Sequence, residues 1–336
     1  MTAGGLLLDV AGLNVRLRLP GGVLHVVNDV DLQLARGETL CLVGESGCGK
    51  SMAALSLLRL LPRIASWSAA RMRFEGADLA ALDDRRFAAL AGNRIAMIFQ
   101  DPMTAFNPVV TLGEQLFEGF LRHRKGDRQA ARDKALYLLD RLQVPAAERR
   151  LTQYPHELSG GLRQRLMIAM ALICEPALVV ADEPTTALDV TVQAQTLRLL
   201  AELQADMDLG LILVTHDLGI VSRMADRVSV MYAGQIVETG GRRSVFERPR
   251  HPYTRGLIDC VPVPGRPLAN GRLGTIDGSV PMMQEGLQGC RFANRCGHAT
   301  DHCRTAAPPV YRAAGQAWRC VLEAGAVPGA VPGAGS

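Results

Sequence analysis

Eight consecutive residues follow the pattern G-x-x-x-x-G-K-S, which wraps a loop around phosphate groups: Gly44-Glu45-Ser46-Gly47-Cys48-Gly49-Lys50-Ser51. The glycines let backbone N–H groups turn toward phosphate oxygens, and the N-terminus of a following helix adds positive potential. In such a loop Lys50 reaches the outer phosphates of a nucleotide, and Ser51 is a ligand for Mg²⁺. The pattern therefore predicts that the loop and the next residue, Met52, bind a nucleoside triphosphate.

The thiol of Cys48 lies inside this loop, where two neighbours could make it reactive. A helix N-terminus and the ammonium group of Lys50 both favour a thiolate. The alternative is a spacer position that tolerates cysteine without using its chemistry.

Two adjacent carboxylates, Asp182 and Glu183, follow the apolar run 177–181. A buried strand with this composition would bring both to the carboxyl edge of a parallel sheet, where ligands bind. There Asp182 would hold Mg²⁺ through water, and Glu183 would act as the base that polarises the attacking water. The structural alternative is an acid that caps the turn at Pro184-Thr185.

A third motif distinguishes between classes of nucleotide hydrolase. Ser159 is a natural N-cap, and Gly160-Gly161 would let an anion approach the N-terminus of the helix that follows. The motif resembles the signature of the ABC ATPase family, LSGGQ followed by a basic, apolar helix, and it reads Leu158-Ser159-Gly160-Gly161-Leu162-Arg163-Gln164-Arg165.

The resemblance extends to further family motifs in the family's order. It implies that Gln100 is the glutamine that senses Mg²⁺ and the attacking water and faces a membrane partner. It implies that Ala187-Leu188-Asp189 is the D-loop, and that His216 is the switch histidine that contacts the γ-phosphate. Taken alone, a histidine after a strand is more often structural.

In that family ATP binds between two ATPase domains arranged head to tail. Because each motif occurs once here, the resemblance implies a second, paralogous ATPase subunit, with a homodimer as the alternative. It also implies two transmembrane permease subunits and, indirectly, an extracytoplasmic solute-binding protein. Residues 249–257 (PRHPYTRGL) are similar to a segment of dipeptide and oligopeptide importer subunits, although the solute itself is not specified.

Four of the eight cysteines lie close together in the sequence with the spacing C-x5-C-x6-C-x16-C: Cys290, Cys296, Cys303 and Cys320. A Pro-rich segment with few apolar residues for a core needs another source of stability, such as a cross-link or a bound metal. In a reducing compartment four thiolates suggest a metal centre. A 4Fe-4S cluster, which the resemblance to peptide importers favours, zinc with His298 or His302 as spare ligands, and free thiols all remain open.

The elements that must position these residues alternate between strands and helices. Apolar runs at 38–43, 94–99, 178–181 and 211–214 predict buried strands, and 190–207 predicts a helix between two of them. This alternation is typical of an α/β fold with a mostly parallel sheet. With the resemblance, it predicts a P-loop NTPase of the RecA-like ABC ATPase class, with a helical subdomain and a small, irregular, Cys-rich C-terminal domain.

Changes in composition divide the chain into expected domains. We expect an ATPase domain at 1–245 with a helical subdomain at about 101–175, a peptide-importer C-terminal domain at 246–323 and a disordered tail at 324–336.

The remaining composition restricts the class of protein. A formal net charge of +4 is too small and too dispersed to indicate a nucleic-acid partner. We expect no membrane-spanning helix, because no apolar run approaches about 20 residues. We also expect no secretory signal, because the first residues, Met1 to Gly5, lack a charged n-region and a long apolar h-region. The resemblance implies the function of an ATP-hydrolysing subunit of a bacterial importer for peptides or related solutes, peripheral on the cytoplasmic face of the inner membrane. DNA- or ribosome-acting ABC ATPases usually carry a long coiled coil or two ATPase domains, and neither is apparent.

Overall fold

The structure, a computed structural model, describes residues 5–185, 189–261 and 274–322. Its contacts divide the chain into two compact units. The first comprises Met1–Asp9, Gln33–Thr39 and Met72–Val214, and the second comprises Val10–Leu32, Leu40–Arg71 and Thr215–Ser336. The expected tail at 324–336 and the D-loop residues Ala187 and Leu188 lie outside the described residues.

The first unit contains three parallel strands: β7 (Ile95–Ile98), β8 (Leu178–Asp182) and β9 (Gly210–Thr215). β8 pairs with both others, in a register that places Ile95 and Gly210 beside Leu178. Every residue of the three strands is buried, which explains why their sequences are almost continuously apolar. A short antiparallel pair, β5 (Arg71–Phe74) with β6 (Ala77–Asp78), also belongs largely to this unit.

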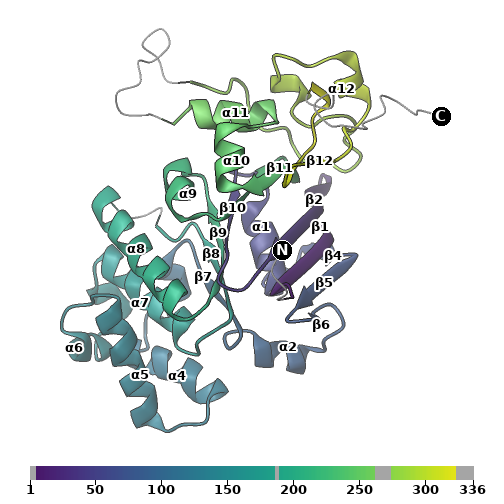
Figure 1. The fold of residues 1–336 in the computed structure, drawn as a ribbon. Helices are drawn as coiled ribbons and strands as arrows, with labels where there is room; N and C mark the ends of the chain where they lie inside the picture. Colours follow the sequence, from purple (N-terminus) through teal and green to yellow (C-terminus); the bar gives the residue numbers. More distant parts are fainter. Residues whose placement is uncertain (1–4, 186–188, 262–273, 323–336) are drawn as a thin grey trace. The chain divides into compact units, whose positions relative to one another are not determined.

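Helices fill the segment between β7 and β8 (Figure 1). The helices of the unit are α2 (Asp84–Leu90), α3 (Pro102–Ala105), α4 (Leu112–His123), α5 (Arg128–Arg141), α6 (Ala147–Leu151), η1 (Pro155–Glu157), α7 (Gly160–Leu172) and α8 (Val190–Asp206). α7 packs against α4 and α5, and most of its side chains, among them Leu166 and Ile168, are buried. The buried guanidinium of Arg165 fixes this packing by donating to the carbonyls of Leu142 and Gln143.

The second unit has strands of both orientations. β10 (Arg227–Tyr232) runs parallel to β3 (Thr39–Val43) and antiparallel to β11 (Gln235–Gly241). Beyond β11, the expected irregular region contributes β13 (Gln316–Trp318), which pairs with β11, and β12 (Tyr311–Ala313), which pairs with β13. The segment expected to be irregular therefore contains two strands, each of three residues.

The unit's other elements are strands β1 (Leu8–Leu19), β2 (Gly22–Leu34) and β4 (Ala65–Ser68), with β4 antiparallel to β1. Its helices are α1 (Lys50–Leu57), α9 (Leu218–Met224), α10 (Arg242–Glu247), α11 (Pro252–Asp259), η3 (Ala293–Arg295) and α12 (Asp301–Thr305). β1, β2, β3, β5 and β9 have residues in both units.

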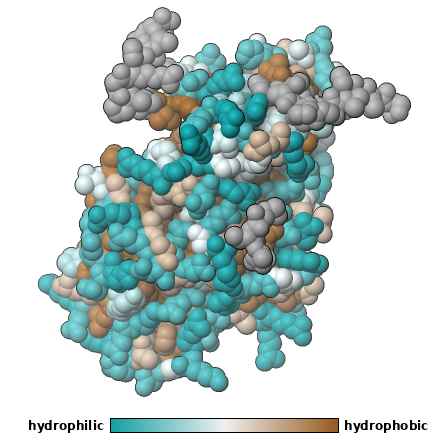
Figure 2. All heavy atoms as spheres, viewed as in Figure 1, coloured by the Kyte–Doolittle hydropathy of each residue, from teal (hydrophilic) through white to brown (hydrophobic). Residues whose placement is uncertain are grey.

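Within the described ranges, no helix combines the length and the apolar character needed to cross a bilayer. On the face drawn in Figure 2, hydrophobic side chains are scattered among hydrophilic ones.

Candidate functional site

The predicted phosphate loop lies in the second unit between β3 and α1. Gly44, Gly47 and Gly49 all have positive φ angles, of 155°, 76° and 102°. A Cβ atom at Gly44 would lie 2.1 Å from the carbonyl oxygen of Met231, and one at Gly49 would lie 2.2 Å from that of Val26. The loop conformation therefore requires glycine at both positions, for steric as well as dihedral reasons.

The side chain of Lys50 is folded back into the loop and only 4% exposed. Its ammonium group donates to the carbonyl oxygens of Gly44 and Glu45, at 2.8 and 2.9 Å. The loop thus holds a buried cation against two of its own backbone carbonyl groups. This arrangement suits an incoming anion.

Four other residues of the predicted site differ in their access to solvent. Ser46 and Gly47 at the tip of the loop are exposed, and Ser51 and Met52 in the first turn of α1 are half-buried. The tip and the helix start are therefore the accessible parts of the loop.

The possibility that Cys48 is a reactive thiol is not supported. Its side chain is fully buried, and burial raises the pKa of the thiol while Lys50 acts more weakly in the opposite direction. The sequence shows the favourable neighbours but not the desolvation, which dominates here. Cys48 is better described as a small apolar residue that packs inside the loop.

The two carboxylates and Gln100 lie in the first unit and follow neighbouring strands. Asp182 is the last residue of β8 and is buried, whereas Glu183 directly after it is half-buried. Gln100, which comes just after β7, donates from Nε2 to Oε2 of Glu183 at 3.2 Å. The structure thus brings together these predicted site residues because β7 and β8 end at the same edge of a parallel sheet.

Glu183 has a backbone conformation that few side chains adopt. Its φ angle is 45°, and its N–H donates to the carbonyl of Val214 at 2.9 Å. A non-glycine residue in this left-handed region costs of order 1–3 kcal/mol, and such strain concentrates at functional sites. The bond to Val214 holds the strained residue where the carboxylate projects beyond the strand.

The signature residues stand at the start of α7, also in the first unit. Ser159 occupies the N-cap position, as expected, but its hydroxyl makes no capping hydrogen bond. A Cβ atom at Gly160 would meet nothing within 4 Å, whereas one at Gly161 would lie 3.0 Å from Val192 Cγ1. Gly160 therefore leaves the helix N-terminus open, and Gly161 permits the close approach of α8.

The last two motif residues, His216 and Asp189, lie next to the N-termini of helices α9 and α8. His216 is exposed in the second unit, in the turn between β9 and α9. Asp189 in the first unit is the N-cap of α8, and its carboxylate accepts from the N–H groups of Thr191 and Val192. Asp189 thus caps the N-terminus of α8. Its role as part of the D-loop, which the family resemblance implies, stays a prediction.

Two residues that were not among the predicted site residues contact the phosphate loop from the C-terminal part of the second unit. The hydroxyl oxygen of Tyr253 accepts from the N–H of Glu45 at 2.9 Å. The guanidinium of Arg295 forms a two-pronged ion pair with the carboxylate of Glu45, at 2.5 and 2.9 Å. No local spacing indicates contacts across more than 200 residues, and only the fold reveals them.

The four clustered cysteines line one small cavity in the second unit, with a volume of about 20 Å³. The backbone N–H of Cys290 donates to the carbonyl of Cys303 at 2.7 Å, which joins the two segments that carry them. Burial raises the pKa of Cys290 and raises that of Cys320 to about 11, and the neighbouring cysteines act in the same direction. Across the described ranges, no three or more His, Cys, Asp or Glu side chains are arranged to hold a metal ion.

His251 also lines this cavity and is completely enclosed. Its Nδ1 accepts from the backbone N–H of Tyr253 at 3.0 Å, and the backbone N–H of His251 donates to the buried carboxylate of Glu238 at 2.9 Å. Burial lowers the pKa of the imidazole to about 3, so the folded chain holds a neutral histidine.

We expect this histidine to make the chain acid-sensitive. Below pH 6.5 His251 is protonated in the unfolded chain but stays neutral in the folded chain. The free energy of unfolding therefore falls as the pH decreases from 6.5 toward 3. Between pH 7 and 5 the loss is about 2 kcal/mol. His251→Asn keeps a helix-capping acceptor without titrating, and Glu238 titrates in both proteins. Urea denaturation should therefore show the extra loss in wild type alone, and identical pH dependence would contradict the assignment.

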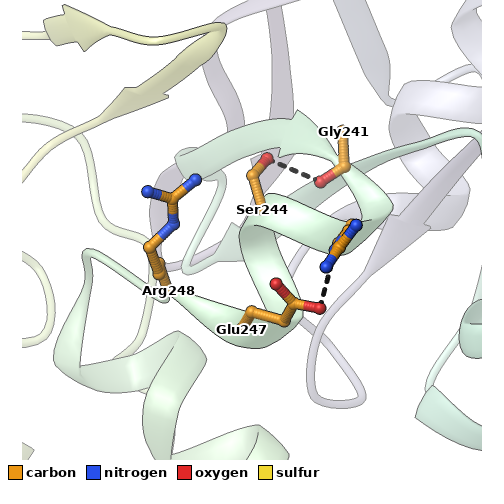
Figure 3. A pocket seen from close by; sticks show the side chains of 5 residues that line it. Gly241, Ser244, Glu247 and Arg248 are labelled. Carbon is orange, nitrogen blue, oxygen red and sulfur yellow. Dashed lines mark hydrogen bonds and ion pairs between the residues drawn. The ribbon is translucent and has the colours of Figure 1, made fainter.

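A further pocket lies beside α10 and contains none of the residues predicted for the site (Figure 3). It is lined by Gly241, Arg243, Ser244, Glu247 and Arg248. Arg243 pairs with Glu247 at 2.8 Å, and Ser244 donates to the carbonyl of Gly241. These contacts join residues of α10 to one another and to the end of β11.

Comparison with solved structures identifies the class of protein. A structure described as the dimeric post-hydrolysis state of an ATP-binding cassette, bound to ADP and Pi, aligns with a TM-score of 0.63 at 23% identity, covering 70% of this chain and 99% of that one. A subunit of a Clostridium perfringens ABC transporter complex aligns with a TM-score of 0.60 at 26% identity, covering 72% and 91%. The fold is that of an ABC ATPase cassette.

Sequence comparison narrows this class. Residues 27–186 match the ABC transporter family model, and residues 237–303 match the model of the oligopeptide/dipeptide transporter C-terminal region. A putative peptide import ATP-binding protein of Brucella melitensis is 48% identical, covering 90% of this chain and 93% of that protein. A dipeptide transport ATP-binding protein of Bacillus subtilis is 49% identical, covering 86% of each. The chain belongs to the ATP-binding proteins of the oligopeptide/dipeptide branch of the ABC transporter family.

Proposed function

We propose that this chain is the ATP-binding and ATP-hydrolysing subunit of a bacterial ABC importer for dipeptides, oligopeptides or related small solutes. The observation that carries the proposal is the phosphate loop, which has three glycines with positive φ angles and holds the buried ammonium of Lys50 at two of its carbonyl groups. The class of cargo is inferred from the relatives, whose names describe peptide and dipeptide transport.

The roles of individual residues follow from their chemistry. The loop from Gly44 to Met52 would bind the phosphates, with Lys50 turning from the loop carbonyls toward them. Glu183 would accept the proton of the attacking water, and His216 would contact the γ-phosphate. Ser159, Gly160 and Gly161 would face ATP bound to a partner cassette, for which the open helix N-terminus beside Gly160 is suited.

Mg²⁺ fits the donor set that the chain offers. The hydroxyl of Ser51, the carboxylate of Asp182 and the amide oxygen of Gln100 are hard oxygen ligands of the kind that this ion prefers. Because Nε2 of Gln100 is directed to Glu183, its Oε1 is the amide atom left for the ion or the water. When bound, Mg²⁺ would neutralise charge on the phosphates.

The proposed setting of the chain is peripheral, on the cytoplasmic face of the bacterial inner membrane. There it would work with two permease subunits and a second ATPase subunit, either a paralogue or an identical copy, and indirectly with an extracytoplasmic solute-binding protein. Family membership supports this assembly, because relatives are named as import proteins and a structural neighbour is described as a dimer. We propose no nucleic-acid partner.

Purification of the tagged chain from its native membrane in mild detergent tests this function. We expect two integral membrane proteins and one ATPase subunit to accompany it, and the complex reconstituted in vesicles to take up peptides only with ATP. Recovery of the chain from the soluble fraction with nucleic acid and without membrane proteins would contradict the proposal.

We further propose that four cysteines hold a 4Fe-4S cluster: Cys290, Cys296, Cys303 and Cys320. They would belong to a C-terminal domain at 246–323, which follows an ATPase domain at 1–245 with a helical subdomain at about 101–175. The four thiols share one cavity, and four thiolates are the usual ligands of such a cluster. The small volume requires the lining to move outward on binding.

Zinc is the alternative metal for this site. A single tetrahedral ion holds each sulfur about 2.3 Å away, so the four sulfurs must converge closely. No such convergence exists in the described part of the chain. A four-iron cluster spreads its ligands over separate metals, so it tolerates thiols that surround a cavity without meeting at one point.

A further inference from the structure

The phosphate loop is held by the C-terminal segment through one residue, Glu45. Three different groups of Glu45 are engaged: its N–H by the hydroxyl of Tyr253, its carbonyl by Lys50 and its carboxylate by Arg295. All of these residues lie in the second unit, so the contacts belong to one compact body.

The side chain of Arg295 is buried and fixed by hydrogen bonds beside the carboxylate of Glu45. Its side chain is 5% exposed, and its Nη1 and Nη2 atoms bind the two carboxylate oxygens of Glu45 separately. The other N–H groups of the guanidinium donate to the carbonyls of Ile276 and Asp277 and to the hydroxyl of Tyr232. Every N–H of the guanidinium therefore has an acceptor, which fixes its plane and with it the carboxylate.

An aromatic cluster supports the second contact. Tyr253 is fully buried, and its ring lies against Tyr232 and Phe292 with centroid distances of 4.6 and 5.4 Å. Arg295 packs over the same two rings, at 5.7 and 6.0 Å. The hydroxyl and the guanidinium that hold Glu45 thus share one rigid support.

The charge of Glu45 gives these contacts a consequence for nucleotide binding. A carboxylate within a loop that receives a polyphosphate repels it, unless a cation neutralises the carboxylate. Arg295 supplies that cation, and Tyr253 fixes the backbone of the same residue.

We propose that Arg295 and Tyr253 are positioning residues of the phosphate loop, which makes the affinity for ATP depend on the C-terminal segment that carries the cysteines. This inference rests on the proposed function, since it assigns a role within the proposed ATP site. Arg295 directly precedes Cys296, so any rearrangement of the cysteine cavity would reach the loop through this contact.

Calorimetric titration of the full-length chain with Mg·ATP tests the proposal. Arg295→Met should weaken binding by about tenfold or more, because it leaves the carboxylate of Glu45 uncompensated. The double variant Glu45→Gln with Arg295→Met should regain most of that loss, since it removes the charge that Arg295 neutralised. A purely structural role of Arg295 would give no such rescue.

Arg319→Met is the matched control, because it removes another arginine of the C-terminal segment, one that is paired with Asp29 at 3.0 Å. It should leave ATP affinity unchanged. If Arg295→Met does not fold, Arg295→Lys and Tyr253→Phe replace it, and each should weaken binding about threefold or more.

The outcomes separate the two proposals. Wild type that binds no ATP would overturn the proposed function. If wild type binds ATP and Arg295→Met binds it with the same affinity, the positioning role alone is overturned. The same holds if Arg295→Lys and Tyr253→Phe, used in its place, both bind ATP with wild-type affinity. Loss of affinity in Arg295→Met without rescue by Glu45→Gln would also overturn it.

Discussion

Glu183→Gln is expected to slow ATP hydrolysis by about a hundredfold or more while leaving ATP binding intact, within the range that loss of a general base costs. Glutamine keeps the shape of the side chain and can still bond with Gln100, but it cannot accept a proton at neutral pH. The strained backbone at φ 45° should be unaffected, because the bond from its N–H to Val214 does not involve the side chain.

Single-turnover phosphate release from the assembled transporter is the measurement, with the partner ATPase inactivated so that only this chain's site is read. Glu175→Gln is a matched control, because Glu175 also has a positive φ angle, of 49°, and pairs with Lys134 on the surface of the same unit. Near-normal turnover in Glu183→Gln would rule out Glu183 as the base.

Loss of any one cavity cysteine is expected to abolish most of the iron bound to the chain. Protein purified without oxygen should be brown, absorb broadly near about 400 nm and contain about four irons if all four thiolates are ligands. A Ser at Cys290, Cys296, Cys303 or Cys320 offers a harder, more weakly bound ligand, so iron content should fall in each variant. Elemental analysis and the visible spectrum measure both effects.

Cys260→Ser is the control for these variants. Cys260 belongs to the same C-terminal segment but does not line the cavity, and it should retain full iron content. Colourless protein with one zinc per chain would favour the alternative metal, and protein without metal would remove the proposal. Retained iron in any cavity variant would exclude that cysteine as a ligand.

The sequence by itself determined the elements whose signals are local. Each of the four apolar runs became a strand within a residue or two of its expected bounds, because strands buried on both faces must be apolar throughout. The phosphate loop could also be predicted from the sequence, because its backbone angles and close contacts require glycine at fixed spacing. The sequence also predicted Asp182 and Glu183 at the carboxyl edge of the sheet, where the structure adds a hydrogen bond from Gln100 to Glu183.

Only the tertiary structure decided the features that depend on distant residues. Cys48 has the neighbours of a reactive thiol, but its burial, which raises the pKa, is produced by the surrounding fold. The ion pair between Glu45 and Arg295 joins residues 250 positions apart, and no periodicity links them. Short strands such as β13 were invisible for the same reason, because their pairing with β11 comes from a partner that is remote in sequence.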